Sequence, residues 1–330
     1  MRGKVESTDK GYDLSGYMPI YAHSLTAGSI PDFDLYIFDG QRMTLYRSSN
    51  LPLTSESCRE LVRQNLNRLY VATAQRAEYQ HYLRDHINQI LADQSVDDFT
   101  KSSIVYDCAK ELVKEMFADP TRGQAIKESQ AFVESTVLYV LEGRNAFHNM
   151  IKVMSFDYSV FTHSVNVCTF SLALAHAVGI DKTNDLIELA TGALLHDIGK
   201  ARIPEAILYK SGPLDEYEWQ TIRQHPQWGV ELVSKTDVIP RASYIPISQH
   251  HERCNGEGYP NRLLDDNIHL YAKIVAIADS FDAMTTNRVY RAAEDTFSTL
   301  KEMNEVEKGF DEQLLRQFIQ LMGPVRPDLV

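Results

Sequence analysis

The sequence is poor in cysteine and has no long apolar run. Its four cysteines lie far apart and form no CxxC pair: Cys58, Cys108, Cys168 and Cys254. This usage indicates neither a disulfide framework nor a zinc ribbon, and it suits a reducing compartment. No apolar run reaches the roughly 18 residues of a membrane span, and charges throughout Met1 to Tyr12 argue against a signal peptide. We therefore expect a cytoplasmic protein without membrane contact.

Basic residues are also in deficit. The chain has 33 Lys and Arg against 45 Asp and Glu, a formal net charge of -12. Such a chain is a poor general binder of DNA or RNA, because attraction to phosphates would need a local basic patch. A small phosphorylated ligand held by a metal and a few arginines is compatible with this charge. The 330 residues, 44% of them hydrophobic, are enough for about two domains.

The first part of the chain, residues 1–95, predicts a small α+β module. Residues 33–47 read as a hairpin around Asp39-Gly40, and further elements follow, a helix after Thr54, a strand at 70–72 and a helix at 78–91. No group of residues in this module indicates a catalytic or binding site. A regulatory role for the module is therefore a hypothesis, and the sequence names no ligand for it.

Beyond about residue 100 the strand signal largely disappears and apolar residues follow helical spacing. The fold class we predict is mainly α, with the small α+β module at the N-terminus. Residues 96–142 are predicted as a helical linker, whose apolar helices could serve a homodimer. A protein signalling partner is a separate possibility. Residues 143–330 are predicted as an all-helical domain.

A histidine and an aspartate stand side by side where a helix is predicted to end. His196 and Asp197 follow the apolar helix from Asp185 to Leu195, and Gly199 marks its stop. Adjacent side chains on a helix point about 100° apart, but at a helix end both can converge on one ion. The alternative is an ordinary polar helix end.

A second pair, His250-His251, precedes a turn from Asn255 to Pro260 that contains two glycines. Neutral imidazoles are the commonest nitrogen ligands of transition metals. The alternative is a pair of exposed histidines beside a turn.

Three more residues are candidate metal ligands, but each one has a plainer explanation when it is taken alone. A core histidine is the alternative for His163, a capping histidine for His225 and a salt-bridged aspartate for Asp279. Together, five histidines and two aspartates come from different helices or helix ends, which is how helical bundles build metal sites.

The ordered set resembles the HD-GYP domain, a subgroup of the HD-type metal phosphohydrolases, over roughly residues 140–310. The match includes His163, His196-Asp197, Lys200, His225, His250-His251, Gly258-Tyr259-Pro260, the run from Asp279 to Met284, Arg288, Tyr290 and Arg291. The resemblance implies a helical HD-type bundle and a centre of iron or manganese. It also implies hydrolysis of cyclic di-GMP to the linear dinucleotide or to GMP. Zinc fits poorly, because seven N/O ligands suit octahedral ions better than a closed tetrahedral site.

We predict two metal ions. Family members with three ions carry a glutamate four residues before the first histidine, where this chain has Ser159, and Asp157 would lie on another helix face. The first ion is expected to take His163, His196, Asp197 and Asp279. The second is expected to take His225, His250, His251 and the other oxygen of Asp197, which bridges. The two ions would activate a hydroxide for attack on the phosphodiester.

Other residues are assigned to the substrate. Lys200 and Asp197 are the predicted catalytic residues, and Lys200 would contact a phosphate or leaving oxygen. Arg288 and Arg291 would hold the second phosphate, unless they are solvated charges. Tyr259 would contact substrate, unless it packs the turn. Glu252 and Glu257 are expected to be exposed rather than to orient histidines.

Three competing interpretations stay open. The chain could be an HD-type enzyme for ordinary nucleotides, although the Gly258-Tyr259-Pro260 loop argues against this. It could be a catalytically weak cyclic-dinucleotide receptor that signals through a protein partner. Least favoured is a helical scaffold with scattered histidines.

Overall fold

The computed structural model separates the chain into two compact units, residues 1–104 and residues 105–330. The structure describes residues 14–63, 66, 68–120, 123–142, 146–154, 159–236, 238–286, 294–305 and 309–323. Among these residues, no helix is both long and apolar enough to span a bilayer.

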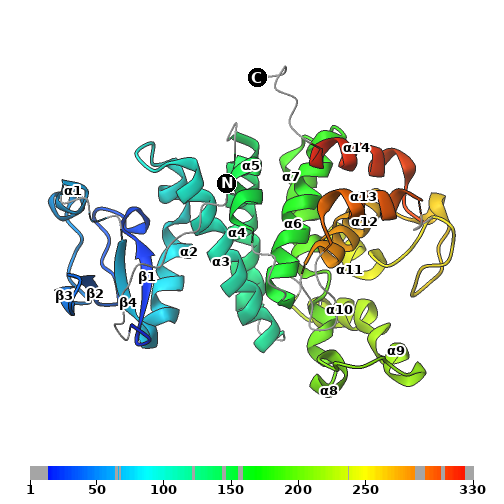
Figure 1. Ribbon diagram of the computed structural model, residues 1–330, viewed down its shortest axis with the longest axis horizontal. Coiled ribbons are helices and arrows are strands. Elements are labelled where there is room, and N and C mark those ends of the chain that lie inside the picture. The colour runs from blue at the N-terminus through cyan, green and yellow to red at the C-terminus, as the bar shows by residue number, and fades with distance from the viewer. Residues whose placement is uncertain are drawn as a thin grey trace. The chain divides into compact units, whose positions relative to one another are not determined.

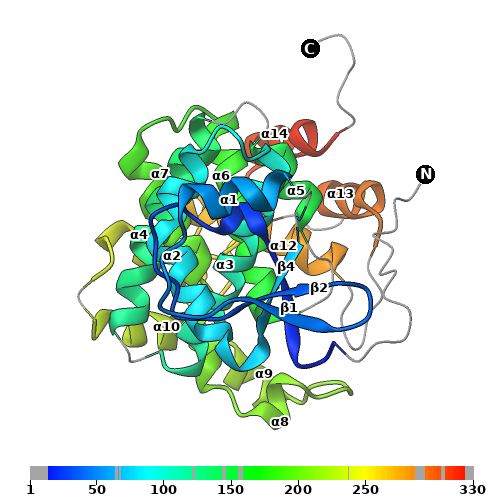
Figure 2. The same cartoon turned by 90° about the vertical axis from the view of Figure 1, so that its left-hand side faces the viewer.

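The first unit contains an antiparallel sheet with the strand order β1-β4-β2-β3. Figure 2 labels β1, β2 and β4 of this sheet. Its strands are β1 (Tyr17–Tyr21), β2 (Leu35–Phe38), β3 (Met43–Arg47) and β4 (Arg68–Ala72). The predicted hairpin is confirmed as β2 and β3. Its turn forms because Gly40 adopts a φ of 89° and Asp39 Oδ1 accepts hydrogen bonds from the backbone N–H groups of Gln41 and Arg42.

The helices of the first unit are α1 (Ser55–Arg63) and α2 (Arg76–Ala92), with short 3₁₀ turns η1 (Ala22–Ser24) and η2 (Thr73–Gln75). Thr54 caps α1 as predicted, its Oγ1 accepting from Ser57 N at 3.1 Å. Helix α2 packs on β4. The aromatic ring of Phe33 meets Tyr79 and Tyr82 of α2 edge-on, each at 5.4 Å between centroids. These contacts close the core of the α+β module.

The described residues of the second unit form helices and no strand beyond an isolated bridge between Asn255 and Leu264. The mainly helical fold class is therefore confirmed. The elements, drawn in Figure 1, are α3 (Asp98–Ala118, which starts before the boundary), α4 (Gly123–Glu142), α5 (Ala146–Val153), α6 (Val160–Ala177), α7 (Thr183–Leu195), η3 (Ile198–Arg202), α8 (Glu205–Leu208), α9 (Glu216–Ile222), α10 (His225–Ser234), η4 (Arg241–Ser243), α11 (Tyr244–Gln249), η5 (Asp265–Asn267), α12 (Leu270–Thr285), α13 (Thr296–Glu305) and α14 (Glu312–Met322).

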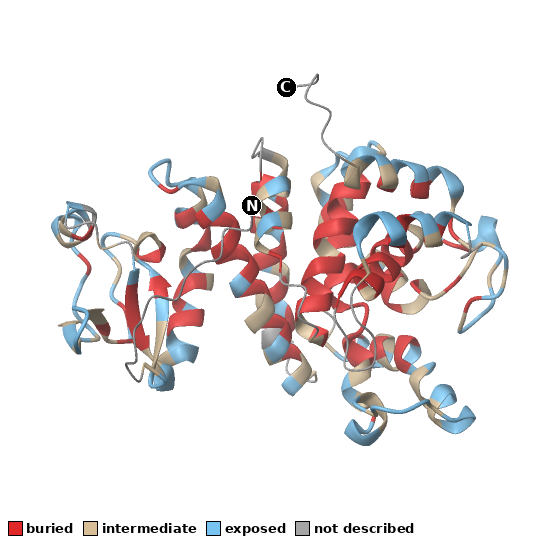
Figure 3. Cartoon of the chain, viewed as in Figure 1, coloured by how far each residue is buried: buried red, intermediate tan, exposed pale blue. Residues whose placement is uncertain are grey.

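Helix α6 is the centre of this unit and is buried along most of its length (Figure 3). It packs against α7, α12 and α14. Phe170 of α6, Phe281 of α12 and Phe318 of α14 form a cluster with ring centroids 5.1 to 5.9 Å apart. Because close-packed interiors resist displacement, the side chains that α6, α7 and α12 carry are held on a rigid frame.

Helix α4 lies within the second unit and packs on α7, with Val133 and Val137 buried. Much of the segment predicted as a linker thus contributes to the helical core. A linking or dimer-forming role for residues 96–142 stays a prediction.

Candidate metal centre

Two neighbouring predicted ligands lie where α7 ends. His196 is the C-cap of α7 and Asp197 is the N-cap of η3, so the chain turns between them. The turn packs η3 against the start of α10 at Gly199. A Cβ atom at this position would overlap the backbone oxygen of His225, so only glycine allows the approach. Gly199 thereby places Asp197 opposite His225.

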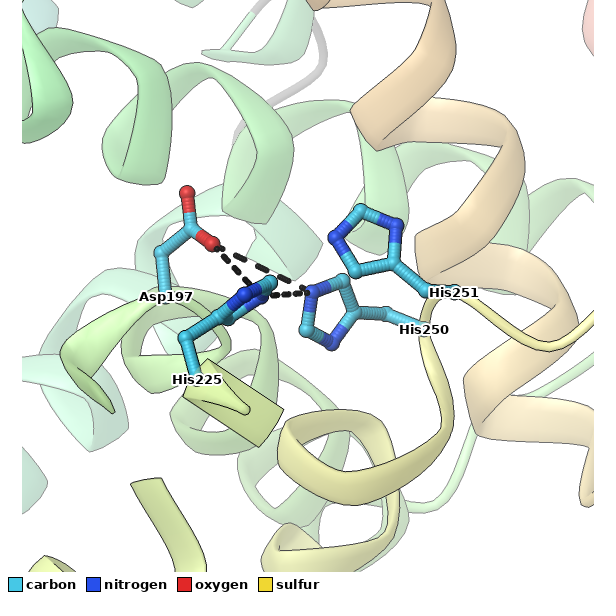
Figure 4. A group of neighbouring side chains, drawn as sticks. All are labelled: Asp197, His225, His250 and His251. Atoms are coloured by element: carbon cyan, nitrogen blue, oxygen red, sulfur yellow. Dashed lines mark hydrogen bonds and ion pairs between the residues drawn. The ribbon is translucent and has the colours of Figure 1, made fainter. Parts of the chain in front are cut away.

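The Asp197 carboxylate lies between two groups of histidines. Its Oδ2 is 3.6 Å from His163 Nε2 and 3.4 Å from His196 Nε2. Its Oδ1 is 3.3 Å from His225 Nε2 and 3.9 Å from His250 Nε2, as Figure 4 shows. One carboxylate oxygen therefore faces each group, which is the geometry of a bridging ligand.

All seven predicted ligands come together in this region of the second unit. Six of them form two groups, and within each group the ligand atoms lie within 4.8 Å of one another. One group contains His163, His196 and Asp197. The other contains Asp197, His225, His250 and His251, so Asp197 belongs to both. Asp279 of α12 lies beside the first group, its Oδ1 3.0 Å from His163 Nε2 and 4.0 Å from His196 Nε2. Its Oδ2 is 3.8 Å from His251 Nδ1.

Backbone carbonyls orient three of the histidine rings. The Nδ1 atoms of His196, His225 and His250 donate to the carbonyl oxygens of Ala193, Ile222 and Pro246 at 2.7, 2.7 and 2.8 Å. Since a carbonyl can only accept, each neutral ring carries its proton on Nδ1 and aims an unprotonated Nε2 into the site. Such partners fix the tautomer that binds metal.

The polar atoms of the centre fit a cation. His196 Nε2 and Asp197 Oδ1 are buried and have no hydrogen-bond partner in the described part of the chain, which would cost about 1 to 3 kcal/mol for each such atom. The Nε2 atoms of His225 and His250 are 3.1 Å apart, and with both protons on Nδ1 their lone pairs face each other. A cation among these atoms would satisfy all of them.

The protonation states match those that bind metal. Burial lowers the pKa of His225 to about 4, and burial also holds the pKa values of His250 and His251 well below the usual range. Burial alone would raise the pKa of Asp197, but Lys200 and the histidines outweigh it and hold that pKa well below normal. The second group therefore consists of neutral imidazoles around an ionised carboxylate.

His163 behaves differently. Burial lowers its pKa, but hydrogen bonds to Asp279 and Asp282 outweigh burial and raise the pKa to about 10. Without a metal this ring carries a proton at neutral pH, and a cation on Nε2 would displace it.

The metal-free protein should lose stability as the pH falls from about 6.5 to about 4. Over this window an unfolded chain protonates its histidines, whereas burial keeps folded His225 neutral until about pH 4. A shift of this size corresponds to roughly 3 kcal/mol. His163 acts in the opposite direction around pH 6.5, because its raised pKa keeps the folded ring protonated while the unfolded ring is still gaining its proton. This smaller effect offsets part of the loss.

Urea unfolding of chelator-treated protein at pH 7 and pH 5 would measure part of this loss, because folded His225 begins to protonate only near pH 4. His225→Gln should show a smaller difference between the two pH values. Equal stability of the unchanged chain at both would contradict the depressed pKa values.

The remaining predicted residues fall into three cases. Lys200 Nζ lies 2.5 Å from Asp197 Oδ2. The ring of Tyr259 stacks on His251 at 4.5 Å and an interplanar angle of 25°. Arg288 and Arg291, like Asp157, lie outside the described residues, so their predicted roles stay predictions.

Ser159, which stands where a third-metal glutamate would be, is the N-cap of α6. Its Oγ accepts from Thr162 N at 3.0 Å and contacts Thr162 Oγ1 at 2.8 Å. The side chain is therefore engaged in capping the start of the helix, which supports the prediction of two ions.

The expectation that Glu252 is exposed was wrong. Glu252 is only 2% exposed, and its carboxylate accepts hydrogen bonds from Asn261 N at 2.7 Å and Leu263 N at 2.9 Å. It folds the loop that carries Tyr259 back on itself. Gly258 permits this, because a Cβ there would lie 2.5 Å from Glu252 Cα. Glu257 is exposed as expected.

Asp282 lies in the run from Asp279 to Met284 that resembles the family, but no separate role was predicted for it from the sequence. It is fully buried, and its Oδ2 accepts from His163 Nδ1 at 2.7 Å while its Oδ1 accepts from Asn166 Nδ2 at 2.7 Å. Asn166 Oδ1 in turn accepts from the Tyr106 hydroxyl at 2.9 Å. The available signal was its spacing: three residues after Asp279, it lies on the same face of α12.

Replacing Asp282 by Asn should weaken metal binding at the His163 group by about 10- to 100-fold, because a carboxylate that orients a ligating histidine also raises its basicity. Metal titration monitored alongside thermal unfolding would separate this effect from loss of fold. Asp181→Asn is the matched control, since Asp181 pairs with the exposed His176 at 3.1 Å. Unchanged metal affinity in Asp282→Asn would show that the contact does not position His163.

This fold and site resemble those of an HD-type helical domain. Residues 152–314 match the HD domain family. The expected likeness to HD-GYP proteins is confirmed for the fold by the solved structure of Bd1817, described as an HDG"Y"P protein, from Bdellovibrio bacteriovorus. The two share 21% identity with a TM-score of 0.64, over 92% of this chain and 99% of the other.

Curated relatives share higher identity over shorter stretches. The cyclic di-GMP phosphodiesterase PA4108 of Pseudomonas aeruginosa is 32% identical over 69% of this chain and 55% of its own length. The 3'3'-cGAMP-specific phosphodiesterase 2 of Vibrio cholerae is 41% identical over 39% of this chain and 25% of its own. The cyclic di-GMP phosphodiesterase of Thermotoga maritima is 32% identical over 50% of this chain and 45% of its own. The chain thus spans about half or less of these relatives.

Proposed function

We propose that this protein is a metal-dependent phosphodiesterase that hydrolyses a cyclic dinucleotide, with cyclic di-GMP as substrate. The observation that carries the proposal is the Asp197 carboxylate, which turns one oxygen to each of two histidine groups. The relatives support the substrate class, since they are named phosphodiesterases of cyclic di-GMP or 3'3'-cGAMP.

The donor set favours two divalent ions, with iron first and manganese second. His163, His196, Asp197 and Asp279 would hold one ion, and His225, His250, His251 and Asp197 the other. Nitrogen and carboxylate ligands with no thiolate suit such ions. When bound, a pair of divalent ions acidifies water and polarises a phosphodiester.

The chain's own residues supply positioning and charge. Lys200 Nζ contacts Asp197 and its side chain is 15% exposed; this ammonium group would contact a phosphate or leaving oxygen of the substrate. Asp197 and Asp279 hold the histidines and stay ionised through their depressed pKa values. Tyr259 covers His251 and forms one wall of the site.

Anaerobically purified protein, analysed for metal and incubated with a panel of cyclic and linear nucleotides, tests the proposal. We expect about two ions per chain and conversion of cyclic di-GMP to the linear dinucleotide or GMP. Hydrolysis of ordinary nucleotides alone would indicate another HD-type activity. Tight binding of cyclic di-GMP without product at full metal loading would indicate a receptor that signals through a partner.

A further inference from the structure

Arg223, at the end of α9, is held by aromatic rings. Its guanidinium carbon lies 5.9 Å from the ring centroid of Trp219, one turn earlier on α9, and 5.7 Å from that of Tyr259. The residue is exposed, and its side chain makes no hydrogen bond or ion pair with any residue that the structure describes. A planar cation is thus kept in place while its N–H donors stay available.

This guanidinium is adjacent to the candidate metal centre. Tyr259, over which it lies, stacks on His251, with the ring centroids 4.5 Å apart. Arg223 also precedes His225 by two residues, and the His225 ring is tied to Ile222 O at 2.7 Å. One aromatic ring therefore separates Arg223 from His251, a predicted metal ligand. A substrate whose phosphodiester lies at the metal centre would contact Arg223 with another of its groups.

The surroundings favour a nucleobase over a phosphate. The faces of aromatic rings are electronegative, so Trp219 and Tyr259 disfavour an anion beside them. The same faces and the guanidinium plane stack well on purines. The five N–H donors of arginine match the O6 and N7 acceptors of guanine, whereas adenine presents an amino donor in place of O6.

We propose that Arg223 is a specificity-determining residue that binds a guanine base of the cyclic dinucleotide whose phosphodiester lies at the metal centre. This inference rests on the proposed function. The two rings order the guanidinium before the ligand arrives, which reduces the conformational entropy lost on binding.

The test compares cyclic di-GMP with cyclic di-AMP, two ligands with the same sugar–phosphate ring and different bases. Values of kcat/KM are measured on metal-loaded protein for the unchanged chain and for Arg223→Gln. Arg223→Lys keeps the positive charge but lacks the planar guanidinium group and its paired N–H donors. Arg241→Gln is the matched control, because Arg241 is also exposed and lies at the start of η4.

We expect Arg223→Gln to lower kcat/KM for cyclic di-GMP about tenfold and to leave that for cyclic di-AMP within about twofold. Arg223→Lys should lose most of the same preference, and Arg241→Gln should change neither value. An equal loss with both ligands, full rescue by lysine, or no loss with either would overturn the guanine assignment.

If the unchanged chain hydrolyses neither ligand, the proposed function fails separately. The same comparison is then made with dissociation constants, measured by calorimetry. A guanine preference that disappears in Arg223→Gln supports the assignment, and an unchanged or absent preference overturns it.

Discussion

Replacing Asp197 by Ala should abolish hydrolysis of cyclic di-GMP, lowering kcat by roughly a thousandfold or more. Asp197 is the one residue that both histidine groups share. Its removal takes a ligand from each predicted ion and the negative charge that offsets two cations. The buried Lys200 ion pair is lost with it. Steady-state kinetics and metal analysis of the purified variant would measure both effects.

The control for this prediction is Asp266→Ala, a change of the same type at an exposed position of η5. It should retain activity and metal. Circular dichroism would establish that Asp197→Ala still folds. Normal turnover in the folded variant would refute the bridging role.

Removing the metals should abolish activity and lower the thermal stability of the protein. The Nε2 atoms of His225 and His250 face each other at 3.1 Å, and His196 Nε2 is buried without a partner among the described residues. A cation bound only by the folded state contributes about 2.7 kcal/mol at a hundredfold excess over its Kd. For a unit of this size each ion would therefore raise Tm by several degrees.

Differential scanning fluorimetry before and after anaerobic chelation, with metal analysis of the same samples, checks this prediction. Adding back iron(II) or manganese should restore both Tm and hydrolysis. Unchanged Tm and activity in protein shown to contain no metal would exclude a metal centre at these residues.

The sequence predicted the elements of the first unit with one omission. The hairpin of β2 and β3, the helices α1 and α2 and the strand β4 all appear where the patterns place them. Strand β1 was missed because Pro19 lies in its middle, and proline disfavours strands. The structure accommodates it because β1 is an edge strand, where one side of the backbone needs no ladder partner.

Local chemistry accounts for what the sequence determined by itself. Helix ends, caps and turns depend on residues within a few positions, so the end of α7 at His196 and the cap at Thr54 could be predicted. The resemblance added the order of the seven predicted ligands, which singly had plainer explanations.

Only the tertiary structure decided which atoms face each other. Asp282 beside His163 and Arg223 over Tyr259 are contacts between side chains on different segments. The buried Glu252 shapes the Tyr259 loop by accepting hydrogen bonds from backbone N–H groups of that loop. Such contacts depend on how helices pack and on where glycines such as Gly199 allow close approach. A linear pattern carries no direct record of either, because distances across a core are set by all the packed residues together.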